Sequence, residues 1–343
     1  MPTLGPIDAR TFLIPKNYTT PALEYRSTGS WLVWSTGVSV PKSRTAAPDL
    51  YGYRPGDAVP RRLYANPDRD ATLEMVGGDG SRFVFIEALT QPNSPGIWRL
   101  WYMSSPDAKP LMVDSGIGGQ LPFFAISGQR LVWTAWEGSP PNSQLMLLDL
   151  RTMRRKAIAP ASRLIRYWFP ALDGDRLVYN TVEYAPDLRS DESHVYLLDL
   201  GGSAPAQRLD HATKASEPAI HGDLVVWKET DPTLNFLNGG SMVRYSISRR
   251  TITPVGFPQG VGGAQFSNPS IGNRFIAAWS DNDRAVYVID EQTGQPMRIM
   301  DLGKSDTYPR EAVVRPHVAG DLMAFVVGPP NGDLSLRWLW LPK

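Results

Sequence analysis

A glycine recurs along the chain at nearly constant spacing, and this repeat constrains the fold more than any other feature. It stands at positions 29, 80, 128, 174, 222, 272 and 320, so that neighbours are 46 to 51 residues apart. Short β-branched and aromatic runs such as WLVW, RFVF and RLVW follow it, without a helical period. A period of this length with four short strands in each repeat predicts the blades of a β-propeller.

The stretch Phe169–Asp210 shows the unit most clearly. Gly174 lies between two aspartates, where a tight turn needs a residue that accepts a positive φ. The nearly continuous apolar run Leu177–Tyr179 predicts a central strand that is covered on both faces. A third strand around Tyr196 and a short polar outer strand complete the unit, and the polarity protects that open edge.

We therefore expect an all-β fold, a seven-bladed β-propeller of four-stranded antiparallel blades, forming a single domain over residues 1–343. The blades are expected to begin near residues 20, 70, 121, 168, 216, 267 and 313. The last unit ends without a fourth strand. Residues 1–16, with a strand at Thr11–Ile14, are expected to supply it and close the last blade, the alternative being a loose N-terminal arm.

The repeat has the pattern G-D-x-[ILV]-[VA]-[WYF], then a polar loop, then [VI]-Y-[LV]-[LI]-D. It resembles the TolB-type, WD40-like propeller repeat over essentially the whole chain. The resemblance implies the fold. It implies no single function, because similar repeats occur in transport accessories, peptidase gating domains and polysaccharide lyases.

Composition excludes several classes of function. The absence of cysteine excludes disulfides, thiolate metal sites and a cysteine nucleophile. A net charge of +1 gives no field that would attract nucleic acid, and no apolar run is long enough to span a membrane. The first ten residues hold no apolar signal-peptide core. The scarcity of Lys relative to Arg, the 31 prolines and the repeat favour a periplasmic or secreted protein whose leader is absent, with a cytoplasmic location as the alternative.

The longer connections predict which face carries function. They are expected between the second and third strands of the blades, on the same face as the connections from blade to blade, and they open around the central channel. Basic side chains near this channel mouth would suit a carboxylate, sulfate or phosphate. Scattered surface charge is the alternative interpretation. The candidate ligand-binding residues are Arg69, Arg163, Arg166, Trp168, Lys214, His221, Arg310 and Arg315.

A catalytic alternative depends on the resemblance to lyases. Seven-bladed lyases with similar repeats use several histidines with a divalent metal, or a His–Tyr–Arg set, to remove a proton beside a uronate carboxylate. The corresponding candidates here are His317, Arg315, Tyr167 and Arg166. No motif matches the metal-binding histidine cluster, so no metal site and no cofactor are expected, with a divalent cation in the channel as the alternative.

Two further patterns bear on ligand binding. Asn66-x-Asp68-x-Asp70 begins like a calcium loop, but Ala71 and Gly77 stand where such a loop needs Gly and Glu. Several aromatic residues could stack on a sugar or a peptide, namely Trp136, Tyr167, Trp168 and Tyr308, whereas the tryptophans at repeat positions are expected in the blade core.

The sequence thus favours a non-catalytic, extracytoplasmic binding scaffold with a protein or glycan partner on the long-loop face. The alternative is a polysaccharide lyase or related carbohydrate-active enzyme that acts on an anionic glycan at the channel mouth. A third interpretation is a spacer subunit of an extracellular assembly.

Overall fold

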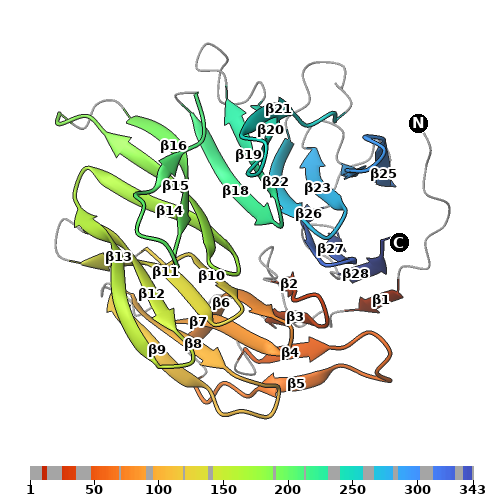
Figure 1. Ribbon diagram of the computed structural model, residues 1–343. Helices are drawn as coiled ribbons and strands as arrows, with labels where there is room; N and C mark the ends of the chain where they lie inside the picture. Colours follow the sequence, from red (N-terminus) through yellow and green to blue (C-terminus); the bar gives the residue numbers. More distant parts are fainter. Residues whose placement is uncertain are drawn as a thin grey trace. The chain divides into compact units, whose positions relative to one another are not determined.

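The computed structural model describes residues 10–13, 25–35, 48–68, 71–89, 96–118, 120–137, 142–187, 191–211, 214–230, 240–257, 266–280, 285–301, 312–328 and 335–341. These residues form 28 strands in seven four-stranded antiparallel sheets (Figure 1). Each sheet uses strands that are consecutive in the sequence, except the sheet that contains β1. The all-β class, the seven blades and, for most blades, the four antiparallel strands are confirmed.

The chain divides into two compact units, one made of residues 1–7 and 123–304 and the other of residues 8–122 and 305–343. Each is described by itself. The single domain expected over residues 1–343 stays a prediction.

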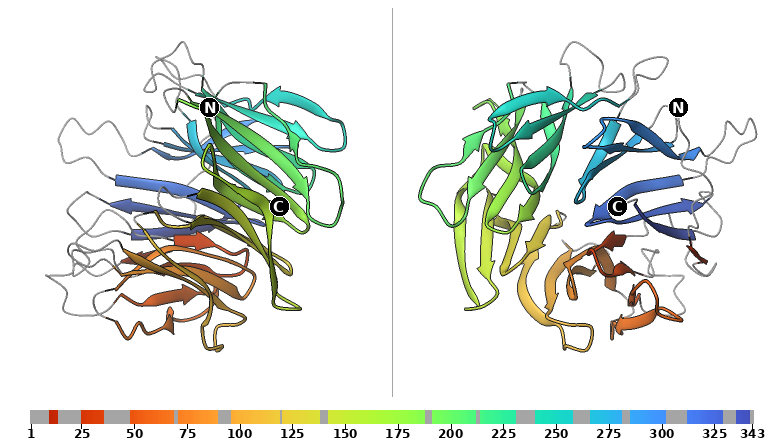
Figure 2. Two further views of the ribbon diagram at one scale, coloured as in Figure 1. Left: turned by 90° about the vertical axis from the view of Figure 1, so that its left-hand side faces the viewer. Right: turned by 45° about the vertical axis from the view of Figure 1, so that its right-hand side comes forward.

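The first unit holds four sheets, whose strands can be followed in Figures 1 and 2. Their strands are β10 Phe124–Ser127, β11 Arg130–Glu137, β12 Asn142–Asp149 and β13 Arg154–Ser162; β14 Ile165–Asp173, β15 Arg176–Tyr184, β16 Asp191–Asp199 and β17 Gln207–Arg208; β18 Ala215–His221, β19 Leu224–Thr230, β20 Gly240–Ser246 and β21 Thr251–Pro254; and β22 Phe266–Ile271, β23 Phe275–Ser280, β24 Ala285–Asp290 and β25 Pro296–Asp301.

The second unit holds the other three sheets. Their strands are β2 Tyr25–Ser27, β3 Leu32–Ser35, β4 Leu50–Tyr53 and β5 Arg61–Tyr64; β6 Ala71–Asp79, β7 Arg82–Leu89, β8 Ile97–Met103 and β9 Leu111–Ile117; and β26 Ala312–Ala319, β27 Leu322–Gly328 and β28 Ser335–Trp340 with β1 Arg10–Leu13. β1 pairs antiparallel with β28, from Arg10 opposite Trp338 to Leu13 opposite Ser335.

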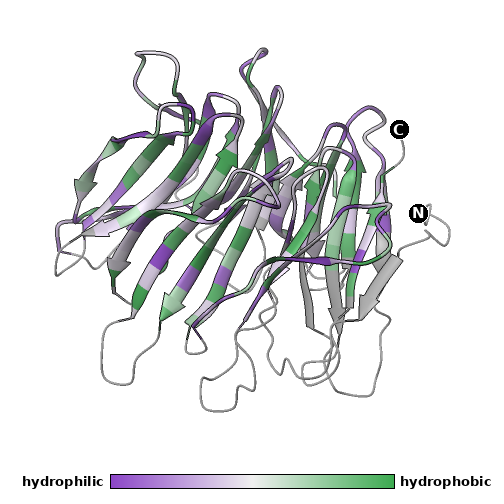
Figure 3. Cartoon of the chain, turned by 90° about the horizontal axis from the view of Figure 1, so that it is seen from below, coloured by the Kyte–Doolittle hydropathy of each residue, from purple (hydrophilic) through white to green (hydrophobic). Residues whose placement is uncertain are grey.

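The core lies between neighbouring sheets of each unit. Second strands such as β3 and β23 are buried along their whole length, as expected for a strand covered on both faces. One cluster packs Val132 of β11 against Leu177 and Tyr179 of β15, and another packs Val178 of β15 against Trp227 of β19. Side chains that alternate along one strand thus serve two different interfaces, and apolar residues gather along the strands (Figure 3).

The recurring glycine has the conformational role that the repeat predicts. Gly174 has φ +60° in the turn from β14 to β15, and five of the six other repeat glycines also lie at positive φ. Gly272 differs, because its N–H donates to the carbonyl of Phe275 in a turn of another type.

Within the described ranges, no helix has the length and apolar character needed to cross a membrane.

Candidate ligand-binding site

In the first unit, the longer connections lie at one end of the blades. β11 ends at Glu137 and β12 begins at Asn142, while β15 ends at Tyr184 and β16 begins at Asp191. At the other end, β14 and β15 are joined by the two-residue turn Gly174-Asp175. We call the end with the longer connections the loop end.

Five aromatic rings and one arginine meet at the loop end of the blades β10–β13 and β14–β17. Ring centroids lie 5.1 Å apart for Phe123 and Trp168, and 5.9 Å apart for Trp136 and Trp168. Phe169 lies 4.5 Å from Phe123. All of these side chains are partly exposed. We call the set the aryl cluster; it comprises Phe123, Trp136, Arg166, Trp168, Phe169 and Tyr184.

Arg166 lies between two of these rings. Its guanidinium carbon is 5.2 Å from the ring centroid of Trp136 and 5.6 Å from that of Tyr184. Cation–π contacts at these distances fix the side chain without an acidic partner. In the described part of the chain, no carboxylate forms an ion pair with Arg166.

Three N–H donors of the aryl cluster are unused among the described residues. They are Nε of Arg166 and Nε1 of both Trp136 and Trp168, and each atom is buried. A buried donor without an acceptor costs about 1–3 kcal/mol. The buried donors are therefore a local cost to the fold, and only the exposed parts of the rings and of Arg166 are open to a ligand.

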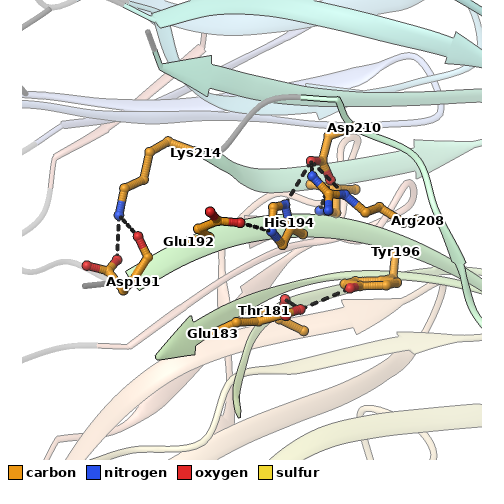
Figure 4. Close-up of polar contacts among 10 residues, drawn as sticks. Thr181, Glu183, Asp191, Glu192, His194, Tyr196, Arg208, Asp210 and Lys214 are labelled. Carbon is orange, nitrogen blue, oxygen red and sulfur yellow. Dashed lines mark hydrogen bonds and ion pairs between the residues drawn. The ribbon is translucent and has the colours of Figure 1, made fainter. Parts of the chain in front are cut away.

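A second polar group lies around β16 (Figure 4). Asp210 is fully buried, and its carboxylate accepts from the Val195 N–H at 2.6 Å and lies 2.9 Å from His194 Nδ1. Arg208 donates to the same carboxylate through Nε and Nη2. The other ring nitrogen of His194 lies 3.1 Å from Glu192.

This group is structural in character. His194 is 2% exposed, so its ring does not face solvent. Asp210 is the second residue of the segment that leads from β17 to β18, and its contacts fasten that segment to β16. Lys214 ends the same segment and donates to the carboxylate and the carbonyl of Asp191. The crossing from one blade to the next is thus tied at both ends.

The tyrosines beside this group are poor bases. Burial raises the pKa of Tyr196 to about 12, with further contributions from its hydrogen bond to Glu183 and from the charge of Glu183. Burial also raises the pKa of Tyr167, and the charge of Glu183 adds to the effect. Removing a proton from a ligand requires a base that is ionised near the working pH.

The predicted residues of the first unit separate into distinct places. Arg166 and Trp168 lie in the aryl cluster. Arg163 is exposed in the turn before β14, and Lys214 is paired with Asp191. Tyr167 is 5% exposed and packs against Tyr179 between the blades, so its ring does not face a ligand at the loop end. His221 ends β18 opposite Leu224, at the end away from the longer connections.

The predicted residues of the second unit are less completely described. His317 of β26 lies opposite Ala324 of β27 and is partly buried. Arg315 belongs to the same strand, but its side chain lies outside the described residues, as do Arg69 and Arg310. Tyr308 lies outside them too.

Sequence reasoning missed part of both groups. Phe123, Phe169 and Tyr184 were not considered as ligand contacts, and Asp210 was not considered as a partner of His194. The sequence did hold one signal for Phe169. Phe169 and Glu217 each precede a proline and each stand five residues before a repeat glycine, so they occupy equivalent positions of the repeat.

Comparisons with known proteins show the fold. No protein-family model matches the chain, and no curated protein matches it. A prolyl endopeptidase structure matches with TM-score 0.64 and 15% identity, over 95% of this chain and 50% of that one. The propeller domain of the Trilobed protease from Pyrococcus furiosus matches with TM-score 0.64 and 9% identity, over 92% and 94%.

An oligogalacturonate lyase in complex with manganese matches with TM-score 0.61 and 12% identity, over 100% of this chain and 96% of that one. The chain therefore spans half the length of the prolyl endopeptidase but nearly all of the lyase. At these identities the likeness extends to the fold and not to activity. The protein is an all-β seven-bladed β-propeller that resembles the propellers of these enzymes, without a specific family.

Proposed function

We propose that the protein is a non-catalytic binding scaffold, acting outside the cytoplasm, that holds an acidic glycan or an acidic segment of a protein at the aryl cluster. The observation that carries the proposal is the position of Arg166. The guanidinium is fixed between Trp136 and Tyr184, and it has no carboxylate partner among the described residues. An arginine fixed in this way can bind a carboxylate or sulfate in two-pronged geometry.

The indole rings support the same function. Trp136 and Trp168 combine an apolar ring with a buried N–H that has no acceptor among the described residues. The exposed parts of such rings can stack on the C–H face of a sugar or on a peptide side chain. The location outside the cytoplasm is supported by the composition and by the TolB-like repeat.

Binding to immobilised acidic glycans and acidic peptides tests the proposal. Arg166→Lys keeps the charge but loses the planar fork, so we expect affinity to fall about 10- to 100-fold. Arg163→Lys is the matched control, because Arg163 is exposed in the preceding turn, and it should change little. Trp168→Ala should also weaken binding, whereas the exposed Trp340 should tolerate the same change. Equal affinities for the Arg166 variant and its control would refute the proposal.

A lyase is the second candidate function, and the match to oligogalacturonate lyase over the whole chain favours it. That lyase is in complex with manganese. In the described parts of this chain, no three His, Asp or Glu side chains lie together as metal ligands do. These residues do not fit a manganese site, and we derive no metal-assisted step. Incubation with oligogalacturonate decides the question, because a lyase forms an unsaturated sugar that absorbs ultraviolet light.

We also propose that β1 closes the propeller by serving as the fourth strand of the last blade. Its pairing with β28 supports this role. Closure would remove an open sheet edge. Deleting residues 1–16 should then lower the unfolding midpoint and promote association through the uncovered edge of β28. An unchanged midpoint with a monomeric deletion variant would contradict the role.

A further inference from the structure

Four strands, each the first of its sheet, contain one residue each in the left-handed region. At these places a β-bulge interrupts the register of β6, β14, β18 and β22. The left-handed residues have φ between 42° and 55°, and none is glycine. Such a conformation is strained for a residue with a side chain, and bulges often re-aim side chains beside binding sites. The four residues are Met75, Phe169, Glu217 and Asn268.

In the first unit the equivalent positions lie on or directly before strands β10, β14, β18 and β22, which contact one another in that order. Phe123 stands five residues before Gly128, as Phe169 and Glu217 stand five before their own repeat glycines. Phe123 contacts Phe169 with ring centroids 4.5 Å apart. Farther along, the Asn268 N–H donates to Glu217 Oε2 at 2.6 Å. We call Phe123, Phe169, Glu217 and Asn268 the bulge row.

The bulge row joins the aryl cluster and changes character along its length. Phe123 and Phe169 belong to both groups. Glu217 and Asn268 then bring a carboxylate and an amide, and all four side chains are partly exposed. In the described residues Glu217 forms no ion pair, and its only hydrogen bond uses Oε2. Oε1 is therefore left to accept from a ligand, and its charge repels an acid group.

The stretch of β14 that leads from Arg166 to the bulge row has a suitable length for an extended ligand. Arg166 and Phe169 are three residues apart on β14, which corresponds to about 10 Å at the rise of a β-strand. A ligand whose acid group meets Arg166 would therefore place its next ring or residue over Phe169 and beside Glu217. Arg166 is cationic and Glu217 is anionic. A ligand with an acid group on every sugar is therefore disfavoured, because one of its acid groups would meet Glu217.

We propose that the bulge row determines specificity, and that Glu217 selects a glycan in which one acidic sugar is followed by a neutral or amino sugar that donates a hydrogen bond. The inference rests on the proposed function at the aryl cluster. A fully acidic chain would meet like charge at Glu217, while a hydroxyl or amine there gains an acceptor. The Asn268 N–H, which donates to Oε2, holds this carboxylate in place.

The test compares two probes of equal length by tryptophan fluorescence titration. One is a disaccharide of glucuronate and N-acetylglucosamine, and the other is a disaccharide of galacturonate. We expect the wild-type protein to prefer the first by about tenfold. Glu217→Gln keeps an acceptor for the Asn268 N–H but removes the charge, so this preference should disappear. Glu217→Asp keeps the charge and should retain much of it.

The outcomes separate the inference from the proposed function. If Arg166→Lys weakens both probes while Glu217→Gln leaves their ratio unchanged, the bulge row does not determine specificity and only the scaffold function stands. If the wild-type protein binds neither probe but binds an acidic peptide through Arg166, the glycan specificity is wrong. If it binds none of them, both proposals fall.

Discussion

Replacing Asp210 should destabilise the protein far more than replacing a comparable surface carboxylate. Asp210 is fully buried and accepts hydrogen from the Val195 N–H at 2.6 Å and from His194 at 2.9 Å. Asp210→Ala leaves two buried donors without an acceptor, at about 1–3 kcal/mol each. Arg208 is 43% exposed and can turn to water, so it adds little. We expect a loss of about 2–6 kcal/mol, because two buried donors lose their acceptor.

Asp191→Ala is the matched control. Asp191 pairs with Lys214 on the same segment, but the two side chains are 44% and 26% exposed. Such a pair contributes about 0–1 kcal/mol. Urea unfolding, followed by both fluorescence and circular dichroism, measures the two variants side by side. The reasoning is refuted if Asp210→Ala lowers the unfolding free energy no more than Asp191→Ala does at an unchanged m-value.

Three further outcomes are expected. Arg274 holds the pKa of Asp290 at about 2, so the stabilisation from this pair is complete above the ordinary carboxyl pKa and is lost as pH falls through about 2. In urea unfolding, Asp290→Asn should therefore lower stability by about 1–2 kcal/mol at pH 7 and by much less at pH 2. Tyr196 should ionise only near pH 12. Ultraviolet absorbance titrations of the wild-type protein and of Tyr196→Phe measure this, and a difference between the two curves near pH 10 would contradict it. Gly174→Ala should cost about 1–2 kcal/mol because Gly174 has φ +60° with open space around it, whereas Gly256→Ala, where an added methyl also meets nothing, should change the midpoint little.

The blade architecture could be predicted from sequence because its signals are local. The Gly174 turn and the apolar run Leu177–Tyr179 report the conformation of residues next to each other. The side-chain groups could not be predicted in the same way. Tyr167 and Trp168 are neighbours that point to opposite sides of β14, so one is buried between blades and the other joins the aryl cluster.

Contacts between blades depend on register and on bulges, which the repeat does not encode. Arg166 was expected near a ligand, but its place between Trp136 and Tyr184 follows from the packing of β11 and β15 against β14. The contact of His194 with Asp210 joins residues 16 apart across an irregular segment. Neither contact leaves a periodic trace in the chain.

The inner-strand bulges make the scaffold easy to diversify. The left-handed position is occupied by a thioether, a ring, a carboxylate and an amide in four examples, Met75, Phe169, Glu217 and Asn268, on the same backbone. Because a bulge residue is released from the ladder, its side chain can be exchanged without altering strand pairing. Recognition could thus be reprogrammed one blade at a time, by grafting, with asparagine as a starting residue that tolerates the backbone.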